Sequence, residues 1–242
     1  MVFVVYSDVH SNLEALNVFF EALNDIPYGR LVCLGDIVGY GADPNPVVEL
    51  IREKTNIVLG GNHDFAAIGK TDPSNFNPYA FNSCMWTRSE LLQENQRYLQ
   101  GLSSKKVIDG ITWVHSSPLE PEKWHYVLPY SFNEKNFEHF NTKICFVGHS
   151  HVPVLLEKTP QAEIKTLFKT EYFLRRDCRY IVNVGSVGQP RDGCQNPAFV
   201  VYDSEKDKVK FYRFSYDFTL TQQKILRAGL PPYLAKRLAE GR

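Results

Sequence analysis

The sequence predicts an α/β fold for this chain of 242 residues. In its first third, short runs rich in Val, Ile and Leu alternate with helical patterns, as in proteins with a partly parallel sheet. The second half is richer in strands separated by turns. No repeat, low-complexity tract or linker interrupts the chain, and this length is ordinary for one α/β domain. We therefore expect residues 1–242 to form a single domain.

The expected strands are short apolar or β-branched runs, which are typical of buried strands. The first five cover residues 2–6, 31–34, 56–59, 111–114 and 144–147. Three more cover residues 180–184, 198–203 and 208–214, and residues 203–207 form the hairpin loop between the last two.

Helices are expected where caps precede an apolar periodicity. A capping box at Ser11 to Glu14 starts the first helix, whose apolar face is Leu13, Leu16, Phe20 and Leu23. A second helix starts at residues 45–46, with Asn as its cap and Pro in its first turn. Further helices are expected over residues 78–98, 220–226 and 233–238. The irregular segments 70–77 and 116–141 adjoin polar motifs and are candidate pocket walls.

Polar motifs directly follow the first five predicted strands. They are Asp8-Val9-His10, Gly35-Asp36, Gly60-Gly61-Asn62-His63-Asp64, His115 and Gly148-His149-Ser150-His151. Open α/β sheets place their sites at the carboxyl ends of strands, so we expect these side chains to meet. Their nitrogen and oxygen donors suit Mn²⁺, Fe, Ni²⁺, Co²⁺ or Zn²⁺ and argue against thiolate-type structural zinc.

A carboxylate such as Asp36 can bridge two cations. Two ions about 4 Å apart clamp both oxygens of an in-line displacement and lower the pKa of bound water toward neutrality. This is the chemistry that cleaves a phosphoester.

In these motifs the chain resembles the calcineurin-like metallophosphoesterases. The segment from Asn183 to Gly193 and the closing Leu230-Pro231 resemble the small prokaryotic phosphoesterase and phosphodiesterase branch of that superfamily. The resemblance implies a four-layer α/β/β/α sandwich, with two mixed sheets face to face and helices outside.

The resemblance also implies roles for individual residues. Two divalent ions, with Mn²⁺ favoured, would share Asp36. One would be held by Asp8, His10, Asp36 and His151, and the other by Asp36, Asn62, His115 and His149. The implied catalytic residues are His63, as the donor of a proton to the leaving oxygen, and Asp64, as the residue that orients it. Arg191 would contact a substrate phosphate.

Two departures from the family pattern bear on specificity. The protein-phosphatase branch continues its central Asp with Arg-Gly, whereas this chain continues Asp36 with Ile37-Val38-Gly39. This disfavours a phosphoprotein substrate. Relatives have Gly where this chain has Ser116. The Ser116 hydroxyl either faces and narrows the pocket or is a neutral replacement.

We therefore expect a phosphodiesterase or phosphatase that acts on a small phosphate ester. A nuclease on the same fold and a non-catalytic protein-binding scaffold remain alternatives. The 27 basic and 27 acidic residues balance, which disfavours nucleic acid and a membrane surface as partners. The sequence has no signal-peptide pattern, and a cytoplasmic location is expected. The sequence does not predict an oligomeric state.

Other residues are assigned structural roles. The five cysteines have no CxxC spacing and are expected to be free thiols. His125 and His139 lie outside the motifs and are expected on the surface. For a group of aromatic residues, core packing is favoured over stacking on a base: Tyr79, Phe81, Trp86, Trp124 and Tyr126.

Overall fold

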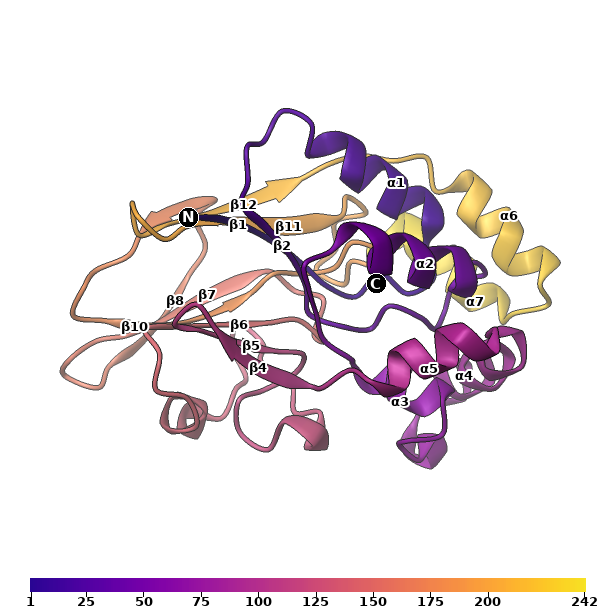
Figure 1. Ribbon diagram of the computed structural model, residues 1–242, viewed down its shortest axis with the longest axis horizontal. Coiled ribbons are helices and arrows are strands. Elements are labelled where there is room, and N and C mark those ends of the chain that lie inside the picture. The colour runs from indigo at the N-terminus through magenta and orange to yellow at the C-terminus, as the bar shows by residue number, and fades with distance from the viewer.

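The computed structural model describes residues 1–242 and contains two six-stranded mixed sheets that pack face to face (Figure 1). The first sheet has the order β3-β2-β1-β11-β12-β9. Its strands are β3 (Ile57–Val58), β2 (Arg30–Cys33), β1 (Val2–Tyr6), β11 (Ala198–Asp203), β12 (Lys208–Arg213) and β9 (Glu171–Phe173). The second sheet has the order β4-β5-β6-β10-β7-β8. Its strands are β4 (Lys105–Ile108), β5 (Ile111–Val114), β6 (Ile144–Val147), β10 (Arg179–Asn183), β7 (Val154–Lys158) and β8 (Ile164–Leu167).

Parallel pairing occupies one part of each sheet. Strands β1, β2 and β3 run parallel in the first sheet, and β5, β6 and β10 run parallel in the second. Their carboxyl ends therefore lie at a common edge, and the polar motifs follow them there. The predicted hairpin is confirmed, because β11 and β12 pair antiparallel across residues 203–207.

The core between the sheets is aromatic and aliphatic. The ring of Trp113 stacks on Phe146 with centroids 5.0 Å apart and packs against Phe3 at 5.6 Å. All three side chains are fully buried. This packing fixes β1 of one sheet against β5 and β6 of the other, and so fixes the motifs that follow these strands relative to one another.

Seven helices flank the sheets, and the predicted sandwich of two mixed sheets with outer helices is confirmed. They are α1 (Leu13–Ala22), α2 (Pro44–Lys54), α3 (Asn62–Ala67), α4 (Pro78–Glu90), α5 (Gln93–Gln100), α6 (Thr219–Arg227) and α7 (Pro232–Glu240). The outer face of the second sheet packs instead against the segment that holds the 3₁₀ turns η2 (Pro121–Lys123) and η3 (Glu134–Glu138), through Val127, Phe137 and Phe140. No helix is long and apolar enough to cross a bilayer.

Two predicted helix starts are wrong by one or two residues. The cap of α1 is Asn12 rather than Ser11, since the Asn12 side chain accepts a hydrogen bond from the Ala15 amide. The predicted apolar face does pack on the core, with Leu16 and Leu23 buried and Leu13 and Phe20 partly buried, and it also includes Ala15 and Phe19. Helix α2 begins at Pro44, so Asn45 lies inside its first turn and does not cap it.

The predicted helix over residues 78–98 is two helices, α4 and α5, separated by Leu91 and Leu92 in extended conformation. The Asn45 side chain stabilises this break. Its amide donates to the Glu90 carbonyl at 2.8 Å, and its oxygen accepts from the Leu92 amide at 2.9 Å. A long-range contact thus overrides the local helical pattern.

Candidate metal centre

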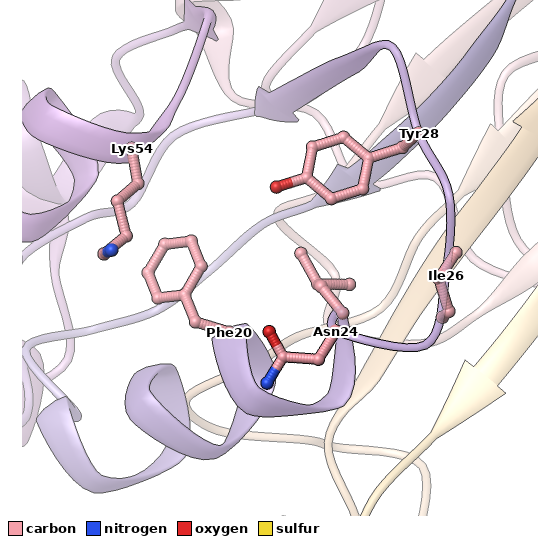
Figure 2. Close-up of a pocket in the computed structure, with 6 residues that line it drawn as sticks. Phe20, Asn24, Ile26, Tyr28 and Lys54 are labelled. Carbon is pink, nitrogen blue, oxygen red and sulfur yellow. The ribbon is translucent and has the colours of Figure 1, made fainter.

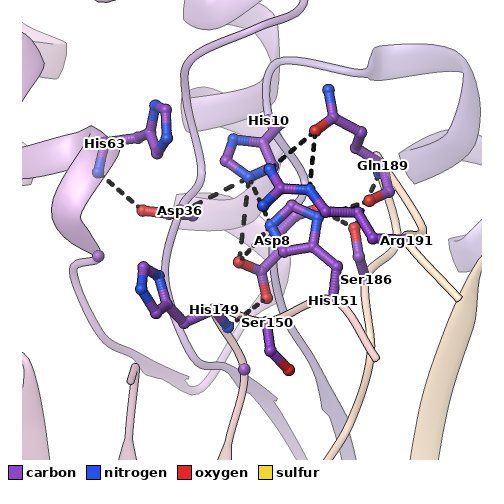
Figure 3. A network of polar contacts seen from close by, with 12 residues as sticks. Asp8, His10, Asp36, His63, His149, Ser150, His151, Ser186, Gln189 and Arg191 are labelled. Atoms are coloured by element: carbon purple, nitrogen blue, oxygen red, sulfur yellow. Dashed lines mark hydrogen bonds and ion pairs between the residues drawn. The ribbon is translucent and has the colours of Figure 1, made fainter. Parts of the chain in front are cut away.

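The seven predicted metal ligands lie close together at the carboxyl ends of the parallel strands, and Figure 3 shows five of them: Asp8, His10, Asp36, His149 and His151. They form two groups that share one residue. Within each group, every His and Asp offers a ligand atom within 4.8 Å of the others. The first group is Asp8, His10, Asp36 and His151, and the second is Asp36, His115 and His149. All of these side chains are buried.

In the first group, imidazole and carboxylate atoms converge on one point. The Nε2 atoms of His10 and His151 are 3.1 Å apart, and His151 Nε2 lies 3.2 Å from Asp8 Oδ1. Each ring is held by its other nitrogen, because His10 Nδ1 contacts the Val38 carbonyl and His151 Nδ1 contacts the Gln189 carbonyl. An N–H donated to a carbonyl leaves the opposite nitrogen free to bind a metal.

In the second group, backbone carbonyls again hold the imidazole rings, but the nitrogen that is held differs between the two histidines. His115 Nδ1 contacts the Leu34 carbonyl at 3.0 Å, which leaves Nε2 facing Asp36 Oδ2 at 3.4 Å. In His149 it is Nε2 that contacts a carbonyl, that of Trp124 at 2.9 Å, so Nδ1 is the free nitrogen. Asn62 adds a buried side-chain oxygen without a hydrogen-bond partner.

Asp36 joins the groups through a single oxygen. Its Oδ1 accepts a hydrogen bond from the His63 amide at 2.9 Å. Its Oδ2 lies 3.7 Å from His10 Nε2 and 3.4 Å from His115 Nε2, and so faces both groups. The carboxylate is thus oriented by the backbone on one side and presented to both groups on the other.

The residues fit divalent cations. Asp8 Oδ1, Asn62 Oδ1 and His115 Nε2 are buried atoms without hydrogen-bond partners, which is costly unless a ligand satisfies them. The buried carboxylates of Asp8 and Asp36 form no ion pair with Lys or Arg. Burial lowers the pKa of His115, but the carboxylates, Asp36 first, outweigh burial and raise the value to about 9. The carboxylates thus stabilise positive charge at His115, whereas burial lowers the pKa of His10, His149 and His151 and keeps these imidazoles neutral.

The backbone at the ligands is strained. Five of the ligands have φ between 50° and 64°, a region that non-glycine residues rarely adopt, and these are Asp8, His10, Asp36, His149 and His151. Each such residue costs about 1–3 kcal/mol and persists where the surroundings enforce it. Gly61 shows how closely the chain packs here, because a Cβ at that position would lie 2.1 Å from Asp36 Oδ1. Strain gathered on ligand residues is typical of a functional site.

His63 lies beside the two groups but belongs to neither. Its ring packs against Tyr40 at 4.4 Å and Phe76 at 4.9 Å between centroids, and its Nδ1 is buried without a partner. Burial lowers the pKa of His63 to about 4, so the imidazole is neutral at neutral pH in the free site. A negatively charged ester beside it would favour its protonated form.

Asp64 does not orient His63, and that expectation is wrong. Its Oδ1 accepts from the amides of Ile37 and Val38 at 2.9 and 3.0 Å, and its Oδ2 accepts from the Gly61 amide at 2.9 Å. No hydrogen bond joins Asp64 to His63. Asp64 instead ties the loop after β2 to the loop after β3, which are the loops that carry Asp36 and Asn62. Proximity in sequence was misleading because the two side chains point in different directions.

Asp64→Ala is expected to destabilise the metal-free protein by about 2–4 kcal/mol, because three buried N–H donors lose their acceptor. Urea denaturation of metal-stripped protein measures this loss. Asp177→Ala is the control, since Asp177 is exposed and pairs only with Arg175. A loss below about 0.5 kcal/mol, the usual range for surface substitutions, would contradict the tie between the loops.

Ser116 does not line the cavity beside the metal centre. Its hydroxyl donates to the Pro121 carbonyl at 2.8 Å, the side chain is buried, and the residue does not have positive φ. Ser116→Gly is therefore expected to leave the ratio of kcat/KM for a small and a large ester within about twofold. Steady-state kinetics on the two esters tests this. A selective increase in kcat/KM for the large ester would show that Ser116 does restrict the pocket.

Arg191 lies at the rim of the first group. Its Nε and Nη2 donate to Gln189 Oε1 at 3.3 and 2.9 Å, and its guanidinium lies 5.5 Å from the centroid of the Tyr40 ring. It pairs with no carboxylate, so its charge is available to an anion. Figure 3 shows Gln189 beside both Arg191 and His151. Gln189 was not singled out by the sequence, although it lies within the quoted Asn183–Gly193 segment.

A cavity of about 620 Å³ opens beside Asn62, His63 and His149. Both irregular segments line it, as predicted: Thr71, Asp72, Asn75, Phe76 and Asn77 on one side, and Glu122, Lys123, Trp124 and Tyr126 on the other. The expectation of core packing is wrong for Tyr79, Phe81 and Tyr126, which are exposed, and Trp124 lines the cavity. A second cavity of about 450 Å³ lies between Phe20, Tyr28 and Lys54, and no predicted site residue lines it (Figure 2).

The predictions for the other two histidines and for the cysteines are confirmed. His125 and His139 are exposed, and all five cysteines are free thiols. Cys33 and Cys145 are buried within β2 and β6.

Comparison with known proteins agrees with this geometry. Residues 1–207 match the family model described as the calcineurin-like phosphoesterase superfamily domain. The chain is 37% identical to an uncharacterized protein of Methanocaldococcus jannaschii over 98% of this chain and 97% of that protein. A metallophosphoesterase from Sphaerobacter thermophilus, known as a crystal structure, is 36% identical with a TM-score of 0.87, over 100% of this chain and 99% of that one. A hypothetical protein from Pyrococcus horikoshii OT3 is 22% identical with a TM-score of 0.79, over 100% and 98% of the two chains, and shows the fold alone.

Proposed function

Because the chain belongs to the calcineurin-like phosphoesterase superfamily, we propose that it hydrolyses small phosphate esters at two divalent metal ions. The observation that carries the proposal is the position of Asp36 Oδ2, which faces His10 Nε2 in one ligand group and His115 Nε2 in the other. One oxygen shared by two groups of donors is what a pair of neighbouring cations requires.

The residues would divide between the ions as the two groups divide. One ion would be held by Asp8, His10, Asp36 and His151, and the other by Asp36, Asn62, His115 and His149. Nitrogen and oxygen donors without thiolate favour Mn²⁺, and they also suit Fe, Co²⁺, Ni²⁺ or Zn²⁺. When bound, such ions neutralise charge on the phosphoryl oxygens and activate the attacking water.

Two further side chains would act on the substrate directly. His63, buried beside Asp36, would gain a proton as the ester's negative charge raises its pKa, and would donate that proton to the leaving oxygen. Arg191, which has no carboxylate partner, would bind a nonbridging phosphoryl oxygen. The presence of His63 and of every predicted ligand argues for an enzyme rather than a scaffold.

Small diesters are the proposed substrates. The loop after Asp36 lacks the Arg-Gly continuation of protein phosphatases, and the cavity of about 620 Å³ is of the size that holds small molecules. We expect cyclic nucleotides or aryl phosphate diesters to be cleaved in preference to phosphoserine proteins.

A matrix of metals against substrates tests the proposal. Metal-stripped protein is supplied with Mn²⁺, Fe²⁺, Co²⁺, Ni²⁺, Zn²⁺ or Mg²⁺ and assayed on an aryl monoester, an aryl diester and a phosphoserine peptide. We expect turnover that requires metal and is fastest on the diester. Phosphopeptide hydrolysis without diesterase activity would reverse the substrate ranking, and turnover by metal-free protein would contradict the proposal itself.

A further inference from the structure

We propose, on the basis of the function proposed above, that the cavity beside the metal centre binds the planar base of a nucleoside phosphate ester, stacked on Tyr126. Two pairs of aromatic residues, each in contact with a histidine of the centre, form walls of this cavity. The first wall contains Tyr126 and Trp124, and the second contains Tyr40 and Phe76.

The first wall is anchored on a predicted metal ligand. The Tyr126 ring stacks on the His149 imidazole, with centroids 4.4 Å apart and planes 15° apart. The same imidazole contacts the Trp124 carbonyl, so both aromatic residues are held at the edge of the centre. Tyr126 is nevertheless 52% exposed. An aromatic ring that is fixed by a neighbour and open to the cavity is a ready surface for stacking.

The second wall starts at the proposed proton donor. The His63 imidazole packs between Tyr40 and Phe76, with centroid distances of 4.4 and 4.9 Å. Tyr40 is buried and Phe76 is half-buried, so this wall is the more rigid of the two. Because the walls start at His63 and His149, the cavity next to the metal centre is lined by aromatic surface.

The charge and polarity of the cavity favour a base over other organic groups. Its charged residues away from the centre are Asp72, Glu122 and Lys123. The cavity therefore has no group of basic side chains that could bind a second phosphate. Its outer part holds neutral polar groups. The Asn77 oxygen caps α4, which leaves its NH₂ group free, and the Asn75 side chain makes no hydrogen bond within the chain. Such groups suit the polar edge of a base, which a simple phenyl ring lacks.

Diesters with a common leaving group test the inference without interference from leaving-group chemistry. Each carries p-nitrophenolate and differs only in its second ester group, which is methyl, cyclohexyl, phenyl or the 5′-position of thymidine. We expect KM to fall from methyl through phenyl to thymidine, by about tenfold or more overall, with cyclohexyl remaining above phenyl. Equal KM for thymidine and cyclohexyl esters would overturn the stacking inference while leaving the phosphoesterase function intact.

Variants at one wall assign the effect to a residue. Tyr126→Leu should raise KM for the thymidine ester roughly tenfold to a hundredfold and change KM for the methyl ester by less than twofold, and Tyr126→Phe should restore the wild-type value. Tyr130→Leu is the matched control, since Tyr130 is 87% exposed and does not line the cavity. An equal change in KM for both esters would mean that Tyr126 only positions His149. That result would overturn the role of Tyr126 as a stacking surface.

A binding measurement keeps this inference separate from the proposed function. Calorimetry on protein loaded with Mn²⁺ compares the phosphonate analogues of thymidine 5′-monophosphate and ribose 5-phosphate, in which a methylene group replaces the ester oxygen and cannot be hydrolysed. We expect the nucleotide to bind about tenfold more tightly, and Tyr126→Leu to remove the difference. Equal binding of both ligands would overturn the inference even if every ester is hydrolysed. Tighter nucleotide binding without any metal-dependent hydrolysis would sustain the inference and contradict the proposed function.

Discussion

Asp36→Asn is expected to abolish turnover and to weaken metal binding in both ligand groups at once. The side chain keeps its shape, but its two terminal atoms are no longer equivalent. The His63 amide donates to Oδ1, so the asparagine oxygen is held there and its NH₂ group takes the place of Oδ2. That group would face His10 and His115 with hydrogen atoms and no free electron pair. An amide nitrogen of this kind cannot act as a metal ligand.

Elemental analysis after dialysis at graded metal concentrations measures this loss, and steady-state kinetics measures turnover. Asp177→Asn is the matched control, because it makes the same chemical change at an exposed ion pair with Arg175. It should retain wild-type metal content and rate. Wild-type affinity for two ions in Asp36→Asn would rule out the shared oxygen, and loss of one ion alone would assign Asp36 to a single group.

His63→Ala should retain metal content and lower turnover by about 10² to 10⁴, the range for a positioned proton donor. The His63 side chain belongs to neither ligand group. Its hydrogen bond to Asp36 comes from the backbone amide, which alanine keeps. The loss should be small for esters with good leaving groups, such as p-nitrophenolate, since these need little protonation. It should be largest for esters of alkyl alcohols.

Kinetics on a series of esters with increasing leaving-group pKa measures this dependence. His139→Ala is the control, since His139 is exposed and far from the motifs in sequence. A loss that is equal across the series would remove the proton-donor role and leave His63 as a residue that stabilises charge on the phosphoryl group. A loss of metal content would instead make it a ligand.

That the ligand side chains meet was predictable because each motif follows a strand, whereas their division between two ions rests on the family resemblance. Asp8, Asp36 and His115 come one to three residues after strands whose apolar runs are clear in the sequence, and parallel pairing brings those strand ends together. The orientation of each ring was not predictable. That His149 uses Nδ1 depends on the Trp124 carbonyl, which lies 25 residues earlier in an irregular segment.

Two of the errors have a common physical cause, since in both a distant contact outweighed a local pattern. The Asn45 side chain stabilises the break between α4 and α5. Asp64 binds amides of two separate loops rather than its neighbour His63. Strands β4, β8 and β9 were missed because they lie at sheet edges, where charged and partly exposed side chains weaken the apolar pattern. The interior strand β7 was also missed, although its first three residues are buried.

Titration of metal-stripped protein with Mn²⁺, followed by calorimetry and by activity in parallel, tests the central claim most directly. We expect two equivalents to bind per chain and full turnover to require the second. We also expect Asp36→Asn to bind neither equivalent at wild-type affinity. Full activity at one equivalent, with no further binding, would contradict a centre in which two ions share Asp36.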